Sequence, residues 1–197
     1  MSIDLRKRIV DLSKKAAFAA NKHGIEGQRA QVVLVLDISA SMNALYQSGV
    51  VQRVIERMLG LAVTFDDDGQ IDLLLFGTNA YLLPPVTLDE IEGYVQRVIL
   101  SQYKIREATH YAPPLRLLLN KYSAPQPAPV FVIFVTDGGN ADKPAVEGAV
   151  HVGAQGDAVA DSVIERIGPR HDVARIDQAG AACAAHLQAG NGAAMAV

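Results

Sequence analysis

Apolar residues along the chain follow two spacings, which predict helices and strands in alternation. Four segments have the spacing of an amphipathic helix, and three short runs are strongly apolar. The helical segments are 3–23, 50–65, 88–100 and 112–122, and the strand-like runs are 31–36, 71–76 and 130–135. Such short apolar runs are typical of strands buried on both faces of a parallel sheet. The order of these elements predicts an α/β fold with a doubly wound, Rossmann-like and mostly parallel sheet.

The composition changes at about residue 141, which divides the chain into regions. All 11 aromatic residues lie at or before Phe134, whereas residues 141–197 hold 16 alanines and 7 glycines. A segment with so few large apolar side chains packs weakly, so we expect it to be poorly ordered. We predict an N-terminal amphipathic helix over 1–27, a single α/β domain over 28–143 and an atypical C-terminal segment over 144–197.

Charge and composition exclude several functional classes. The chain has 18 basic and 21 acidic residues without a basic stripe, which argues against nucleic-acid binding. Its longest strongly apolar run, Val130–Val135, is too short for a membrane span, and the first residues lack the apolar core of a signal peptide. We therefore expect a cytoplasmic protein. The single cysteine, Cys183, excludes a disulfide within the chain and a cysteine-based zinc site.

Oxygen-bearing side chains follow two of the predicted strands. The run 31–36 leads directly into Asp37, Ser39 and Ser41, and the run 130–135 leads into Asp137. Hard divalent cations prefer carboxylate and hydroxyl oxygens of this kind. If the two strands are parallel neighbours, both carboxylates lie at the same edge of the sheet, where α/β folds bind their ligands. Another hydroxyl comes from Thr109, in the loop before the helix at 112–122.

The order of these residues resembles a known metal site. The pattern D-x-S-x-S at 37–41, a loop threonine and T-D-G at 136–138 is similar to the metal-ion-dependent adhesion site of von Willebrand factor A (vWA) domains. The strings L-Y-Q-S-G-V-V-Q from residue 45 and V-F-V-I-F-V-T-D-G-G-N from residue 130 also resemble the A domain of TerF-type tellurium-resistance and stress-response proteins of bacteria. The resemblance covers about residues 3–143 and implies a vWA fold.

This resemblance implies a bound divalent cation, Mg²⁺ or Mn²⁺, with five ligating residues. Ser39 and Ser41 would bind the cation directly, and Thr109 would bind it directly or through water. Asp37 and Asp137 would act directly or through bridging water. Few direct carboxylates leave the cation electrophilic, so a Glu or Asp of a protein partner would complete its coordination.

Residues beside these loops would form the rim that meets the partner. The candidate rim residues are Met42, Tyr46, His110, Tyr111 and Gly138. We predict no catalytic residue, because the motif serines have no nearby histidine and the G-x-S-x-G motif is absent. The expected function is therefore a scaffold in tellurium resistance or stress response, presenting Mg²⁺ to an acidic residue of a partner.

The chain departs from the family pattern at two places. Ala40 stands where the family often has glycine, which is acceptable only if this residue has a negative φ. Residues 144–197 lack the helix, aromatic-rich strand and final helix with which family members continue. A shifted reading frame would produce this change, and it would leave the sheet without its last strand and with an exposed edge.

Two other functions stay open at this stage. The first is a Mg²⁺-dependent phosphoryl-transfer enzyme or receiver-like domain, since such proteins also place an aspartate after a buried strand. Ser39 stands where a phosphatase of this type needs a second aspartate. The second is a truncated, non-functional vWA fragment, which a frame-shifted C-terminal segment would produce. The sequence does not identify the partner, the stress that triggers the function or the oligomeric state.

Overall fold

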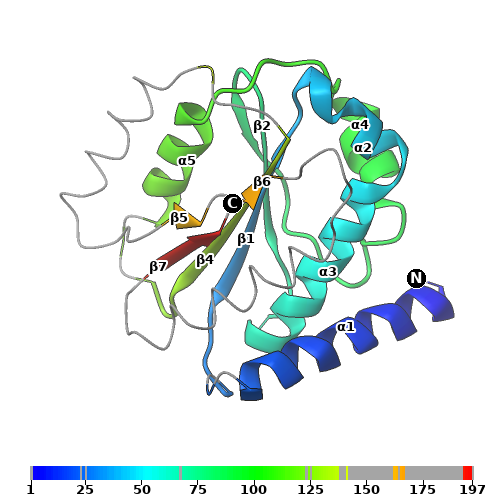
Figure 1. Cartoon of the computed structure of the whole chain (residues 1–197), viewed down its shortest axis with the longest axis vertical. Helices are drawn as coiled ribbons and strands as arrows, with labels where there is room; N and C mark the ends of the chain where they lie inside the picture. Colours follow the sequence, from blue (N-terminus) through cyan, green and yellow to red (C-terminus); the bar gives the residue numbers. More distant parts are fainter. Residues whose placement is uncertain are drawn as a thin grey trace.

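A twisted sheet with helices on both faces forms the body of the protein (Figure 1). The computed structural model describes residues 2–22, 24, 26–66, 68–122, 124, 126–137 and 141, together with the backbone of three short strands at 162–163, 165–166 and 193–196. Four strands precede residue 138: β1 (Gln31–Asp37), β2 (Asp72–Phe76), β3 (Ala80–Leu82) and β4 (Val130–Thr136). Their order in the sheet is β3-β2-β1-β4.

The central strand β1 lies between β2 and β4 and is parallel to both. The β1–β4 register pairs Gln31 with Val130 and Leu36 with Val135, so the two strands end side by side. Strand β3 returns antiparallel to β2 through a tight turn. The predicted mostly parallel, doubly wound α/β sheet is therefore confirmed. The parallel register is what brings the two predicted site loops to one edge.

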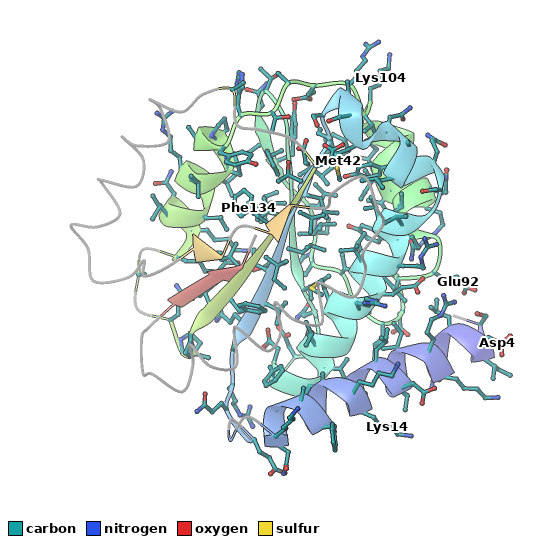
Figure 2. The ribbon with its side chains drawn as sticks, in the orientation of Figure 1. Asp4, Lys14, Met42, Glu92, Lys104 and Phe134 are labelled. Carbon is teal, nitrogen blue, oxygen red and sulfur yellow. The ribbon has the colours of Figure 1, made fainter. Side chains whose placement is uncertain are left out.

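Helices cover the two faces of the sheet unequally. One face carries η1 (Ala40–Met42), α2 (Asn43–Gln47), α3 (Val50–Phe65), η2 (Val95–Ile99) and α4 (Leu100–Gln102), and the other carries α5 (Ala112–Tyr122). Side chains of β1 alternate between the faces. Leu34 and Leu36 pack on the α3 side, whereas Val33 and Val35 pack on the α5 side. Phe134 packs with Val33 and Val35, and Figure 2 shows it between the sheet and α5. Both faces are buried, which explains why residues 32–36, 73–76 and 130–135 of these strands are all apolar.

The N-terminal helix α1 (Ile3–Lys22) packs on the outside of α3 rather than on the sheet (Figure 1). Its buried residues are Leu5, Ile9, Ala16 and Ala20. Gly60 allows the two helices to approach closely, since a Cβ there would lie 2.7 Å from Leu12 Cβ. A guanidinium nitrogen of Arg8 lies 3.2 Å from a carboxylate oxygen of Glu56, a buried residue of α3. Within the described residues, no helix combines the length and apolar character needed to cross a membrane.

The predicted helix over 88–100 is wrong in its first half. Residues 88–93 form turns, and the helical conformation begins only at Tyr94, just before η2. Gly93 has a φ of +61°, which breaks any helix running through it. The side chain of Gln52 then accepts a hydrogen bond from Val95 N at 3.0 Å, which replaces a helical partner for that amide. Strand β3 and the short helices η1 and α2 were not predicted.

Most of the predicted C-terminal segment, 144–197, lies outside the described residues. The structure describes the backbone of β5 (Ser162–Val163), β6 (Glu165–Arg166) and β7 (Ala193–Ala196). Strand β7 runs parallel to β4 from Val130 to Ile133, and β6 pairs with the end of β4. The exposed β4 edge expected for a frame-shifted chain is therefore covered along these residues.

Candidate metal centre

Asp37 is the buried anchor of the candidate site. It ends β1, and its side chain is fully shielded from solvent. Its two carboxylate oxygens accept different hydrogen bonds, one from Ser39 N at 2.6 Å and the other from Thr136 Oγ1 at 2.6 Å. Burial raises the pKa of the Asp37 carboxyl, the two hydrogen bonds oppose this rise, and the negative charge of Asp137 adds to it. A cation beside this carboxylate would relieve the cost of its charge.

The two motif serines connect Asp37 to the second carboxylate. The Oγ atoms of Ser39 and Ser41 lie 3.1 Å apart, and Ser41 Oγ donates a hydrogen bond to Asp137 Oδ1 at 2.7 Å. Ser39 is almost fully buried, whereas Ser41 is exposed and Asp137 is half-buried. The oxygens thus converge from a buried base toward an accessible edge. Three oxygen-bearing side chains in hydrogen-bond contact form a donor set that suits Mg²⁺.

The short helix η1 gives the serine segment its shape. Ala40 is the first residue of this right-handed 3-10 helix, so its φ is negative. The condition for an alanine at this position is therefore met. Tyr46 holds the segment from the core side, because its hydroxyl donates a hydrogen bond to the Asp37 carbonyl oxygen at 3.0 Å. Burial raises the pKa of this phenol well above its ordinary value, and the Asp37 charge adds to the rise, so the hydroxyl remains a donor.

Thr109 lies in the loop between α4 and α5 and is half-buried. Its carbonyl oxygen accepts a hydrogen bond from Ala141 N at 2.9 Å, which ties the loop to the chain just beyond Asp137. His110 N donates to Gly77 O at 3.0 Å, which ties the same loop to the end of β2. The five expected ligands therefore come from three loops at the carboxyl edge of the sheet. Ser39, Ser41, Asp37 and Asp137 form a continuous hydrogen-bonded group with Thr136. Thr109 is connected to the chain beyond this group through its carbonyl bond to Ala141, so its place among the ligands stays a prediction.

Three of the five expected rim residues are buried and therefore inaccessible to a partner. Met42 is fully buried, Tyr46 is 1% exposed and Tyr111 is 8% exposed. Met42 and Tyr46 pack in the core beside α3, where Figure 2 shows Met42 in the interior, and Tyr111 packs against Phe76 and Phe134. These three side chains cannot form the contact surface for a partner, because core packing already covers them. His110 is half-buried beside the site, and Gly138 lies outside the described residues.

Thr136 and Glu107 belong to this site but were not predicted as site residues. Thr136 lies one position beyond the Leu36–Val135 pair, so the parallel register places it opposite Asp37. The sequence does hold a signal for this pairing, because Asp37 directly follows the run 31–36 and Thr136 directly follows the run 130–135. Glu107 forms an isolated bridge with Ser39 and holds the neighbouring loops together. A single acid in a loop carries no sequence signal for such a role.

The donor chemistry fits a Mg²⁺-type site better than a transition-metal site. Among the described residues there is no group of three or more His, Cys, Asp and Glu side chains that could hold a metal ion. The candidate centre instead combines two carboxylates with hydroxyls. Such an oxygen-only set favours a hard cation that keeps several water ligands.

Comparisons with known proteins identify the family to which the chain belongs. Residues 29–159 match the family model described as vWA found in the TerF C terminus. The match therefore extends past residue 143, where the predicted domain ends. YcbR of Bacillus subtilis, an uncharacterized protein, is 36% identical over 145 residues, which cover 70% of this chain and 60% of YcbR. The chain thus spans less than two thirds of the length of that relative.

A solved structure supports the fold alone. An aerotolerance-related membrane protein from Bacteroides fragilis aligns with a TM-score of 0.50 at 17% sequence identity, covering 85% of this chain and 91% of that chain. The match to the TerF-type model covers about two thirds of the sequence. The chain therefore belongs to the TerF-type vWA family, whose domains serve in general as protein-interaction scaffolds.

Proposed function

We propose that this domain binds Mg²⁺ at Asp37, Ser39, Ser41, Thr109 and Asp137 and presents it to an acidic residue of a protein partner. The observation that carries the proposal is the convergence of two carboxylates and two hydroxyls from parallel strands. Ser41 Oγ lies 2.7 Å from Asp137 Oδ1 and 3.1 Å from Ser39 Oγ. When bound, Mg²⁺ supplies a positive charge and coordination positions that a partner carboxylate can take.

In this proposal, a buried residue holds the cation from below and accessible residues bind it on the side that faces a partner. Asp37 supplies negative charge from the buried base, where Ser39 N and Thr136 Oγ1 fix the directions of its oxygens. Ser41 and Asp137 supply oxygens at the accessible side of the group. A fixed, partly open group of this kind favours a cation whose outer face remains available to a partner.

The hydrogen bonds of Asp37 disfavour the phosphoryl-transfer alternative. A nucleophilic aspartate needs a carboxylate oxygen that is free to attack phosphorus. Both Asp37 oxygens accept hydrogen bonds, and the side chain is fully buried. Ser39 also stands where a phosphatase would need its second aspartate. A binding role therefore agrees better with this geometry than a covalent phospho-enzyme.

Mn²⁺ and acetate test the two parts of the proposal separately. Titration of Mn²⁺ into the full chain, followed by the electron paramagnetic resonance signal of free Mn²⁺, measures cation binding. Water-proton relaxation of the Mn²⁺-loaded protein then measures coordinated water, with sodium acetate added against sodium chloride at equal ionic strength. We expect binding, and a fall in relaxation with acetate because the carboxylate displaces water. Binding without an acetate effect contradicts presentation to an acid, and absence of binding contradicts the whole proposal.

We also propose that the partner acts in bacterial tellurium resistance or stress response, on the strength of the family match. In a tellurite-sensitive strain that lacks this protein, the wild-type chain should restore growth on tellurite. The Asp137→Ala variant, expressed at the same level, should not. Equal rescue by both proteins would show that the biological role does not depend on the metal centre.

A further inference from the structure

We propose that Glu107 is the positioning residue of the metal centre, which holds the Thr109 loop and the serine segment in one arrangement. The inference rests on the proposed function, since it concerns the same centre. Glu107 lies two residues before Thr109, outside the five expected ligands, and is half-buried. Its backbone contacts the serine segment and its side chain contacts the β2–β3 turn.

The backbone of Glu107 contacts both sides of Ser39. Glu107 N donates to Ile38 O at 3.2 Å, and Ala40 N donates to Glu107 O at 3.1 Å. Ser39 lies between these two partners, so the pair of bonds joins the D-x-S-x-S segment to the Thr109 loop as in a short parallel bridge. A displacement of Glu107 would therefore move Ser39 relative to Thr109.

The side chain of Glu107 fastens this bridge to a third segment. One carboxylate oxygen accepts hydrogen bonds from Thr78 N at 2.7 Å and Asn79 N at 3.4 Å, and the other accepts one from Tyr81 OH at 3.0 Å. Hydrogen bonds to an ionised carboxylate are stronger than those between neutral groups. The β2–β3 turn therefore serves as a fixed support on which the Thr109 loop rests.

Gly77 leaves the space in which Glu107 sits. A Cβ at Gly77 would lie 2.4 Å from Glu107 Cβ and 2.6 Å from a carboxylate oxygen of Glu107, so a larger residue would displace it. The carbonyl oxygen of Gly77 accepts the hydrogen bond from His110 N at 3.0 Å. The loop is thus fixed on both sides of Thr109, at Glu107 and at His110.

This arrangement matters for a cation that requires near-ideal octahedral geometry. Residues that orient metal ligands without touching the metal typically change its affinity by about 10–100-fold when they are replaced. We expect Glu107→Ala to weaken Mn²⁺ binding by about tenfold or more and Glu107→Gln to weaken it less, because glutamine keeps one acceptor oxygen.

Asp72 provides a matched control at the opposite end of β2. Its carboxylate also accepts hydrogen bonds from side chains, namely Lys121 Nζ at 2.6 Å and the Tyr122 hydroxyl. Asp72→Ala removes a comparable set of bonds far from the centre. Both alanine variants should lower the melting temperature, but only Glu107→Ala should also weaken Mn²⁺ binding by the folded chain. Equal Mn²⁺ affinity in these two variants would overturn the inference, and if Glu107→Ala does not fold, Glu107→Gln is compared with Asp72→Asn.

A metal-free measurement distinguishes failure of this inference from failure of the proposed function. Amide hydrogen exchange at Ala40 and His110 reports the bonds that join the three segments. Glu107→Ala should speed exchange at both amides more than at the core of β1, whereas Asp72→Ala should not. If the wild type binds no Mn²⁺, the metal function is wrong but this exchange pattern still tests the positioning role. Unchanged exchange at Ala40 and His110 contradicts the role whatever the metal result.

Discussion

At the scale of single residues, Asp37 is a carboxylate held in an environment that opposes its charge. Burial raises its pKa, and Asp137 adds a second negative charge, while two hydrogen bonds compensate only in part. A group whose folded-state pKa is raised contributes stability that is lost as pH rises through that pKa. Above its ordinary pKa, Asp37 therefore makes the metal-free protein less stable than a carboxyl with an unshifted pKa would.

Replacement of Asp37 by asparagine tests this cost. Asparagine keeps an oxygen that can accept from Ser39 N and removes the buried charge. We expect Asp37→Asn to raise the melting temperature of the metal-free chain at neutral pH and to remove its response to Mg²⁺. The gain should shrink as the pH falls, because wild-type Asp37 then becomes neutral too. A variant that melts lower than the wild type throughout this range, without Mg²⁺, would contradict the assignment.

Ser41 tests the accessible side of the centre, because its exposed side chain can be shortened at little cost to the fold. We expect Ser41→Ala to weaken Mn²⁺ binding by about tenfold or more, with a change in stability below about 0.5 kcal/mol. Ser101→Ala is the matched control, since Ser101 is also exposed and its Oγ donates to carbonyls of its own helical segment. Wild-type Mn²⁺ affinity in Ser41→Ala would remove this hydroxyl from the ligand set.

At the scale of elements, the strongly periodic segments were predictable and the tight connections were not. The spacing of Val50, Val54 and Met58 predicted α3, and the apolar runs predicted β1, β2 and β4. The helix over 88–100 was predicted too long, because Gly93 adopts a left-handed backbone that the apolar spacing does not reveal. Strand β3 is three residues long and lies at the sheet edge, too short for a period-two pattern to be recognised.

For the candidate site too, residues at strand ends could be predicted from the sequence, whereas contacts made by the loops could not. Strand ends placed Asp37 and Asp137 together, and motif order added the hydroxyls. The burial of Met42 and Tyr46 could not be predicted, because η1 and α2 turn the chain back into the core directly after the serines. The role of Glu107 depends on the contact between two loops that are about 30 residues apart, which local sequence does not encode.

The crossing of α1 and α3 gives a prediction at this scale. Alanine normally stabilises a helix relative to glycine, but a Cβ at Gly60 would lie 2.7 Å from Leu12 Cβ and close to the α1 backbone. Gly60→Ala should therefore destabilise the chain by about 1–3 kcal/mol by forcing the helices apart. Chemical denaturation of the two proteins measures this difference. An increase in stability would show that α1 does not pack on α3 in this way.

At the scale of the whole molecule, the parallel sheet brings the loops of the candidate site to one edge. Strands β1 and β4 supply the acids, the turn between β2 and β3 supplies the support, and the loop before α5 supplies Thr109. The helices on both faces bury the strands and leave this edge to the loops. A scaffold that meets its partner through a cation needs such a rigid base with an accessible edge.

Thermal melting of the full chain with and without Mg²⁺, compared between the wild type and Asp137→Ala, tests whether these residues form a metal centre. A ligand that binds only the native state raises the melting temperature by mass action. We predict that Mg²⁺ raises the melting temperature of the wild type and leaves that of Asp137→Ala unchanged, while both proteins melt cooperatively. A cooperative wild-type melt that does not respond to Mg²⁺, or an equal response in Asp137→Ala, would contradict a metal centre formed by these residues.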